Sequence, residues 1–100
     1  MNIDPRRLQH TFSKHAPDFG IVGTWNLAKA ALLEQAINNH VSNPAVQQIV
    51  GTYRWSISVR HYYDRAIALN VMVDMSNNFI GGWRLSPAQV LYLLTTGNIQ

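Results

Sequence analysis

Apolar positions at helical spacing mark the first segment of the chain. Asp4-Pro5 has the form of a helix N-cap followed by proline at the first helical position, so we predict a helix from there to about His15. Leu8, Phe12 and His15 share one face of this helix, and a basic stripe lies beside it: Arg7, His10 and Lys14. Because Pro17 and Gly20 suit no helix interior, His15 falls in the last turn, on the inward face.

A second helix is predicted from an N-cap at Thr24 to about His40. Its apolar stripe consists of Ala30, Leu33, Ile37 and Val41. Asn43-Pro44 indicates a turn, and the residues at 46–49 are compatible with one further helical turn.

The pattern then changes from helical spacing to alternation. Over residues 54–60, Trp55, Ile57 and Val59 alternate with polar side chains, which predicts a half-buried strand with Trp55 in the core. Residues 60–64 either extend this strand or begin another. Residues 66–75 and 79–85 repeat the alternation on either side of a turn at Asn77-Asn78.

A last helix begins at Ser86-Pro87, again a cap followed by proline, and stops near Gly97. Helices followed by an antiparallel meander and a short closing helix are typical of an α+β domain whose helices cover one face of the sheet. We expect one domain over residues 1–100, with a helical part at about 4–49 and the sheet and closing helix at about 50–97.

Composition excludes several classes of protein and of site. Hydrophobic residues make up 47% of the chain and charged residues 13%, which is too apolar for a disordered segment. No segment has the pattern of a signal peptide or a membrane span. The absence of cysteine excludes disulfides, thiolate zinc sites and cysteine nucleophiles. The five scattered carboxylates form no acidic cluster, so we expect neither a metal ion nor another cofactor.

Arginine dominates the positive charge, since it provides six of the eight cations in a chain of net charge +3. Its planar fork of donors suits phosphate, which favours a polyanionic partner. Charge alone is equally compatible with an ordinary solvated surface.

The histidines and basic residues are the remaining reactive candidates. RNA supplies its own nucleophile, the 2′-hydroxyl, so one proton acceptor and one cation can suffice to cleave it. Lys14-His15 meets this requirement, although a histidine that merely ends a helix has the same pattern. His61, which follows Arg60, could equally belong to a site, whereas His10 and His40 have the pattern of exposed helix residues. No histidine spacing indicates a metal site.

Basic residues on the predicted strands add a second candidate surface. Arg54 and Arg60 share the polar face of one strand, and Arg84 belongs to a nearby strand beside Trp83. Such a surface can bind phosphates and stack unpaired bases. Aromatic residues at strand spacing more often belong to the core, but the glycines at 81–82 thin the strand beside Trp83 and leave its role open.

Several sequence blocks resemble the colicin D-type nuclease domains. They are KHA at 14–16, DFGI at 18–21, GTYR at 51–54, YY at 62–63, the apolar strand at 69–73, FIGGWR at 79–84, YL at 92–93 and TG at 96–97. The blocks occur in the family order with compatible spacing and cover most of the chain from about Leu8.

This resemblance implies a metal-independent endonuclease that cuts tRNA in the anticodon loop. Attack by the 2′-hydroxyl would leave a 2′,3′-cyclic phosphate and a 5′-hydroxyl. The family histidine corresponds to His15, as general base or acid, the basic residue before it to Lys14, and the tryptophan near the site to Trp83. The fold implied is the α+β arrangement of small ribonuclease toxins.

Two positions depart from the family pattern. A family lysine is replaced by Phe12 and a family serine by Gly81. Other groups are therefore expected to bind the substrate and to supply part of the transition-state stabilisation. They are inferred from position only: Thr52, Arg54, Arg60 and Arg84.

The resemblance also implies partners and a place of action. Such domains form the C-terminal part of a longer secreted or cell-surface-delivered toxin, a colicin or a contact-dependent growth inhibition toxin, and act on tRNA in the cytoplasm of a target bacterium. A small, usually acidic immunity protein is expected to cover the basic cleft in the producing cell. Neither an import route nor a need for a host activating factor is visible in the sequence.

Two other classes of function remain as alternatives. A non-catalytic RNA-binding module would use the same arginines and aromatic residues, with salt-sensitive binding and no product. A protein-binding α+β domain would have no affinity for RNA.

Overall fold

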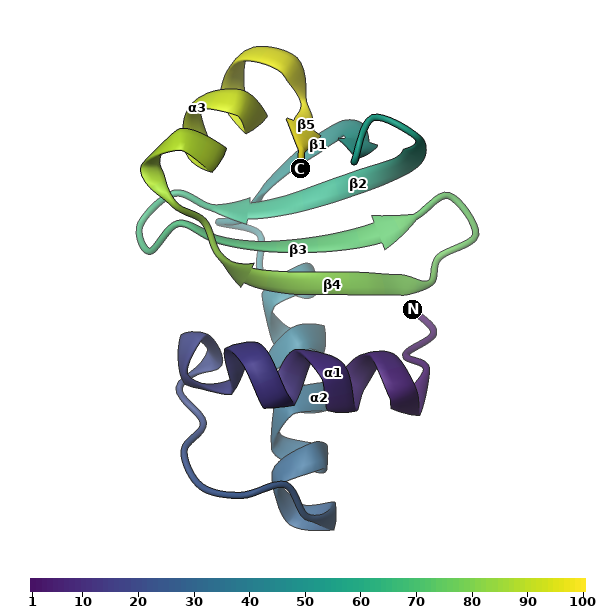
Figure 1. The fold of residues 1–100 in the computed structure, drawn as a ribbon, viewed down its shortest axis with the longest axis vertical. Coiled ribbons are helices and arrows are strands. Elements are labelled where there is room, and N and C mark those ends of the chain that lie inside the picture. The colour runs from purple at the N-terminus through teal and green to yellow at the C-terminus, as the bar shows by residue number, and fades with distance from the viewer.

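The computed structural model describes all 100 residues and shows the α+β fold predicted from the sequence (Figure 1). The elements, in chain order, are α1 Pro5–His15, the 3₁₀ helix η1 Ala16–Phe19, α2 Leu27–Ser42, β1 Gln47–Tyr53, β2 Ile57–Asp64, β3 Leu69–Asp74, β4 Phe79–Arg84, α3 Pro87–Thr96 and β5 Asn98–Ile99.

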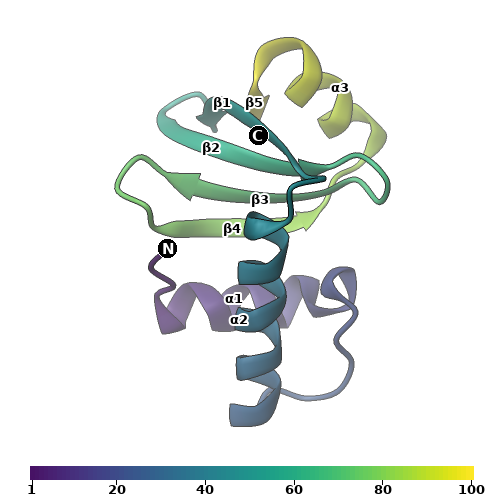
Figure 2. The same cartoon turned by 180° about the vertical axis from the view of Figure 1, so that it is seen from behind.

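The five strands form one sheet in the order β4-β3-β2-β1-β5. Strands β1 to β4 make an antiparallel meander, and the short β5 returns to pair with β1 in parallel. Helices α1 and α2 lie together on the β4 side of the sheet, whereas α3 and β5 lie on the opposite side (Figures 1 and 2).

The sheet is covered by helices on both faces, not on one as the sequence pattern predicted. Val71 and Val73 of β3 pack against α1 and α2, while Met72 between them packs against the cluster that contains Leu93 of α3. Successive residues of a strand point to opposite faces, so an uninterrupted apolar run indicates burial on both sides.

Local hydrogen bonds explain where the helices begin. Asp4 caps α1 by accepting a hydrogen bond from the backbone N–H of Arg6, and Pro5 follows it, as predicted. Ser86 and Gln89 form a reciprocal capping box at the start of α3. The predicted cap of α2 was wrong, because the side chain of Asn26, not Thr24, accepts the hydrogen bond from Lys29 N–H at 2.8 Å.

The sheet begins earlier than predicted. Residues 47–49 belong to β1 and not to an extra helical turn, because every residue of β1 pairs with β2, from Gln47 opposite Tyr63 to Tyr53 opposite Ile57. Residues 60–64 extend the strand that precedes them, within β2. Strand β5 has only two residues and no periodicity that could have predicted it.

Two predicted environments were wrong. Trp55 lies in the turn between β1 and β2 and is 57% exposed, so it is not a core residue. His40 is buried, and its Nε2 lies 2.7 Å from the carbonyl oxygen of Tyr62, which links α2 to β2.

Candidate active site

A cleft of about 550 Å³ lies between α1 and the sheet face that also carries α3. Its floor comes from β4 and Met72, one wall from the basic stripe of α1, and the far end from the start of the β1–β2 turn and the last residue of the chain. The lining residues are Arg7, His10, Thr11, Lys14, His15, Tyr53, Arg54, Ile57, Met72, Ile80, Gly81, Gly82, Trp83 and Gln100.

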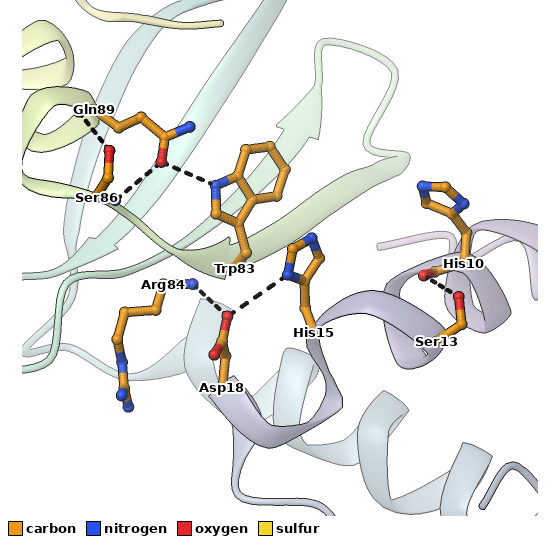
Figure 3. A network of polar contacts seen from close by, with 8 residues as sticks. All are labelled: His10, Ser13, His15, Asp18, Trp83, Arg84, Ser86 and Gln89. Atoms are coloured by element: carbon orange, nitrogen blue, oxygen red, sulfur yellow. Dashed lines mark hydrogen bonds and ion pairs between the residues drawn. The ribbon is translucent and has the colours of Figure 1, made fainter.

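His15 stands where α1 ends and η1 begins. Its backbone leaves the helical conformation at φ −135° and ψ 10°, which turns the chain towards β4. The ring Nδ1 lies 3.7 Å from Oδ2 of Asp18, and the same oxygen accepts a hydrogen bond from the backbone N–H of Arg84 at 2.9 Å (Figure 3). Asp18 is therefore anchored to the sheet on one side and faces the imidazole on the other. No protein group forms a hydrogen bond with Nε2 of His15.

The second support of His15 is Trp83 on β4. The two rings are stacked, with centroids 5.5 Å apart and planes inclined by 27°. The indole Nε1–H donates to Oε1 of Gln89 at 3.4 Å, and Gln89 also forms the capping box with Ser86 (Figure 3). The start of α3 thus fixes the indole against which the imidazole rests.

The environment of His15 favours the neutral ring. Partial burial is the main cause that lowers its pKa below the ordinary value of 6.5, and the nearby charges of Lys14 and His10 lower the pKa further, while Asp18 opposes them. At neutral pH the imidazole is therefore mostly unprotonated. A neutral imidazole in a cleft can accept a proton from a bound molecule.

Cations surround this imidazole from two directions. Arg7 and Lys14 come from α1, which also places His10 in the lining, and Arg54 comes from the β1–β2 turn. The guanidinium of Arg7 donates to the carbonyl oxygen of Ile80 at 3.2 Å, which attaches α1 to β4. A cleft with this lining favours an anion, and its cations can stabilise negative charge that develops during a reaction.

Aromatic rings connect the imidazole to the far end of the cleft. Tyr53 meets Trp83 edge to face with ring centroids 6.1 Å apart, and the guanidinium carbon of Arg54 lies 4.9 Å from the centre of the Tyr53 ring. A chain of ring contacts therefore runs from His15 through Trp83 and Tyr53 to Arg54.

The structure brings four of the residues predicted for the site into the cleft, namely Lys14, His15, Arg54 and Trp83. The other three lie outside its lining. The hydroxyl of Thr52 donates to Asn98 at 2.8 Å. Arg84 provides a backbone donor to Asp18, and its side chain points away from His15 (Figure 3).

Arg60 lies on the opposite face of the sheet from the cleft. It is paired with Val73, whose side chain belongs to the core formed with α1 and α2. Directly opposed residues of neighbouring strands share a face, so Arg60 points to the α1–α2 side.

His61, the other histidine considered for a site, is part of the sheet interior and is 0% exposed. Its Nε2–H donates to the carbonyl oxygens of Thr52 at 3.1 Å and Gly97 at 2.9 Å, and its Nδ1 accepts from the Asn70 amide at 3.0 Å. These partners require the neutral Nε2–H tautomer, and burial lowers the pKa of His61. Both nitrogens are thus occupied, which makes His61 a structural residue.

The two departures from the family pattern have different structural settings. Phe12 is only 6% exposed, belongs to the core under α1 and meets Trp25 edge to face at 5.2 Å. A lysine ammonium at that position would be buried. Gly81 lines the cleft, where a Cβ atom would lie 3.4 Å from the Trp83 ring.

Sequence reasoning missed five residues of the site. They are Asp18, Gln89, Tyr53, Arg7 and His10. The stripe of Arg7, His10 and Lys14 was visible in the sequence, but the direction in which it faces depends on the packing of α1 against β4. Asp18 stands three residues after His15, which is a recognisable spacing only once η1 is known to follow α1.

No group of three or more histidine or carboxylate side chains is arranged to hold a metal ion. None of the helices combines the length and the apolar composition that a membrane span requires.

Comparison with known proteins finds a matching family model and similar solved structures. The family model described as Colicin D matches residues 7–93. Among solved structures, the chain is similar to one described as a ribonuclease from Escherichia coli complexed with its inhibitor protein, with 27% sequence identity and a TM-score of 0.81. That similarity covers 92% of this chain and 99% of the other. No curated protein matches the sequence.

Proposed function

The chain belongs to the Colicin D family of ribonuclease toxins, and we propose that it cuts tRNA in the anticodon loop without a metal ion. The observation that carries this proposal is His15, a neutral imidazole with an unoccupied Nε2, held by Asp18 and Trp83 in a cleft lined by cations. The family membership supports an RNA substrate, and the cleft supports the reaction.

The proposed reaction uses the 2′-hydroxyl of the substrate as nucleophile. His15 accepts the hydroxyl proton, and the 2′-oxygen forms a bond to the adjacent phosphorus. The bond from phosphorus to the 5′-oxygen breaks, and that oxygen takes a proton from a cationic cleft side chain or from water. The products are a 2′,3′-cyclic phosphate and a 5′-hydroxyl end, and DNA is not a substrate because it has no 2′-hydroxyl.

The surrounding cations act on the charge that develops on the phosphoryl oxygens. Lys14 is next to His15, while Arg7 and Arg54 reach the cleft from its two sides. Stabilisation of charge that grows in the transition state is commonly worth about 3–4 kcal/mol for each donor. We assign to these three residues the charge stabilisation that the family pattern assigns to a lysine, because Phe12 occupies the position of that lysine in this chain.

A single-stranded loop fits this cleft better than a duplex. Trp83 and Tyr53 expose aromatic surface on its floor and far end, and such surfaces stack bases that are splayed out of a loop. An anticodon loop presents unpaired bases beside accessible phosphates, which is why we assign it as the substrate region.

We also propose an immunity protein as the natural partner. The similar ribonuclease is bound to its inhibitor protein, and the cationic cleft of this chain suits an acidic protein that covers it. As part of a longer toxin delivered to a rival bacterium, the domain would act on tRNA in the cytoplasm of that cell.

Denaturing gels of total bacterial tRNA incubated with the protein in EDTA test the function. We expect discrete half-length fragments with wild type and none with His15→Ala, while Tyr92→Ala on the exposed side of α3 cuts like wild type. Mapping of the fragment ends should place the cut in the anticodon loop, with a cyclic phosphate. Intact tRNA with the wild-type protein at low ionic strength contradicts the proposal, and a gel shift without product would support the RNA-binding alternative.

A further inference from the structure

The turn between β1 and β2 has an unusual backbone. Arg54 and Trp55 both adopt left-handed conformations, with φ of 53° and 61°, and the N–H of Ser56 donates to the carbonyl oxygen of Tyr53 at 3.3 Å. Turns of this kind usually contain glycine, asparagine or aspartate, because larger side chains are strained when φ is positive. Two consecutive bulky residues in this conformation need another explanation.

The end of the chain holds this turn in place. The backbone N–H of Arg54 donates to the carbonyl oxygen of Ile99 at 2.7 Å, and the N–H of Trp55 donates to Oδ1 of Asn98 at 2.9 Å. The indole Nε1–H of Trp55 donates to Oε1 of Gln100 at 2.9 Å. Strained residues persist where the surrounding structure determines their conformation in this way, and they are frequent at ligand-binding sites.

Core packing does not explain the tryptophan, because its side chain remains 57% exposed. The turn instead presents it beside the cleft, in contact with Gln100, which is part of the cleft lining. Arg54 of the same turn lies in the cleft over Tyr53, at the end of the ring contacts that begin at His15.

We propose that Trp55 stacks on an unpaired base of the RNA substrate, next to the nucleotides that bridge the scissile phosphate, while Arg54 binds the phosphate between them. This inference rests on the proposed function and adds a residue that determines substrate affinity. Trp55 binds RNA away from the reacting atoms, so it affects binding and not the chemical step. The left-handed turn is the feature that turns the indole out of the sheet.

Binding experiments on non-cleaving protein test the proposal. In the His15→Ala background, we expect Trp55→Gly to weaken binding of an anticodon stem-loop RNA about tenfold, since stacking on one base is worth roughly 5- to 150-fold in affinity. Trp55→Phe keeps an aromatic surface but loses the bond to Gln100, and it should bind within about threefold of the parent. The matched control is Tyr92→Ala, which removes an equally exposed aromatic residue, 57% exposed on α3, and leaves the affinity unchanged.

Thermal melting separates this role from a structural one. Glycine tolerates the left-handed conformation, so Trp55→Gly should melt at or above the wild-type temperature even though it binds RNA more weakly. Equal RNA affinity of the parent and Trp55→Gly overturns the inference, whatever the cleavage activity. A wild-type protein that binds the stem-loop but leaves all RNA intact overturns the proposed cleavage and not the stacking site, and an absence of binding overturns both.

Discussion

His15, the proposed general base, and His61 have the same side chain in different surroundings. Burial lowers the pKa of each, so both rings are neutral at neutral pH. His61 uses both of its nitrogens to join three strands, through carbonyl oxygens of β1 and Gly97 and the Asn70 amide of β3. His15 forms no hydrogen bond through Nε2 and stands in a cleft among cations.

The contrast shows which features support the proposed catalytic role of His15 and the structural role of His61. A lowered pKa is common to both and decides nothing by itself. We propose the chemistry for His15 because its Nε2 forms no hydrogen bond with the protein, faces a cleft and has charged groups around it, whereas both nitrogens of His61 are hydrogen-bonded within the sheet.

The first way to test the contrast is to remove each ring, beginning with His15. We expect His15→Ala to lower the single-turnover cleavage rate of tRNA by about 10²- to 10⁴-fold, the usual contribution of a general base. Its free energy of unfolding should change by less than about 1 kcal/mol, because the ring is partly exposed and makes no hydrogen bond. A variant that keeps a tenth of the wild-type rate would contradict the assignment.

His61→Ala should lower the stability of the protein and leave its cleavage rate nearly unchanged. It removes a fully buried ring, takes a donor away from the carbonyl oxygens of Thr52 and Gly97, and takes the acceptor away from the amide of Asn70, although Gly97 still accepts from the N–H of Thr52 at 2.9 Å. We expect a loss of about 2–4 kcal/mol in the free energy of unfolding, measured by denaturant titration. The cleavage rate well below the melting temperature should stay within about threefold of wild type.

His10→Ala is the control for both substitutions, since it removes an exposed histidine from the same helix as His15. It should leave stability unchanged and lower the rate by less than about tenfold, because the exposed His10 side chain lines the cleft but forms no hydrogen bond with the protein. A stability loss in His10→Ala as large as that of His61→Ala would show that the comparison reports a general property of histidine removal.

The local part of this arrangement could be predicted from sequence. The cap and proline that start α1, together with Pro17 and Gly20 that follow it, bounded the helix and placed Lys14 and His15 in its last turn. The cap at Ser86 and the proline after it predicted the start of α3 for the same reason, since both signals depend on residues within one helical turn.

The rest of the candidate site could not be predicted, because it depends on contacts between segments that are distant in the sequence. Alternation over residues 54–60 placed Arg54 and Arg60 on one face of a continuous strand, but the left-handed turn at Arg54 and Trp55 interrupts that strand. Arg54 therefore enters the cleft while Arg60 faces α1 and α2. The turn contains no glycine to indicate it, and the hydrogen bonds that stabilise it come from residues 98–100.

Charges around His15 provide a finer test of its role. Lys14 lowers and Asp18 raises the pKa of His15, so Lys14→Gln should raise that pKa and Asp18→Asn should lower it. The pH–rate profile should shift in the same directions, because the neutral ring is the form that we propose to accept the proton. Titration of the His15 ring by NMR measures the pKa directly, and shifts of the same sign in both variants would contradict this picture.

Asp18→Asn should also lower the rate about tenfold at a pH where His15 is neutral in both proteins. Asparagine can still accept from Arg84 N–H but attracts the imidazolium that forms during the reaction less strongly than a carboxylate does. Glu34→Gln on the exposed side of α2 is the matched control, and we expect it to leave both the rate and the pKa unchanged.

The pH dependence of the free energy of unfolding tests the structural role of His61 in protein that keeps its fold. Its pKa in the folded protein is lower than the unfolded value of about 6.5, so the unfolded chain binds the proton first as pH falls. The stability that comes from the neutral ring is therefore complete above that pH and is lost below it, by at most about 1.4 kcal/mol per pH unit. Denaturant titrations of His61→Gln should show a shallower acid slope than those of the wild-type protein, and identical slopes would contradict the prediction.

The smallest effect is expected at Gly81, where the family resemblance implies a serine. Gly81 has no positive φ, and a Cβ atom there would lie 3.4 Å from the Trp83 ring and 3.9 Å from Met72, so Gly81→Ser should fold normally. Its hydroxyl would add a donor to the cleft beside Trp83, and one such hydrogen bond is worth about 1 kcal/mol. We expect the cleavage rate to rise about threefold, measured under single-turnover conditions.

Gly82→Ser is the matched control, because its Cβ would lie 3.1 Å from a backbone oxygen of Asn70 and from Phe19 and Val71, so that variant should lose stability and gain no activity. A lower rate in Gly81→Ser would mean that the substrate itself occupies the space beside Trp83, and the cleft would then be adapted to a larger group than the family pattern implies.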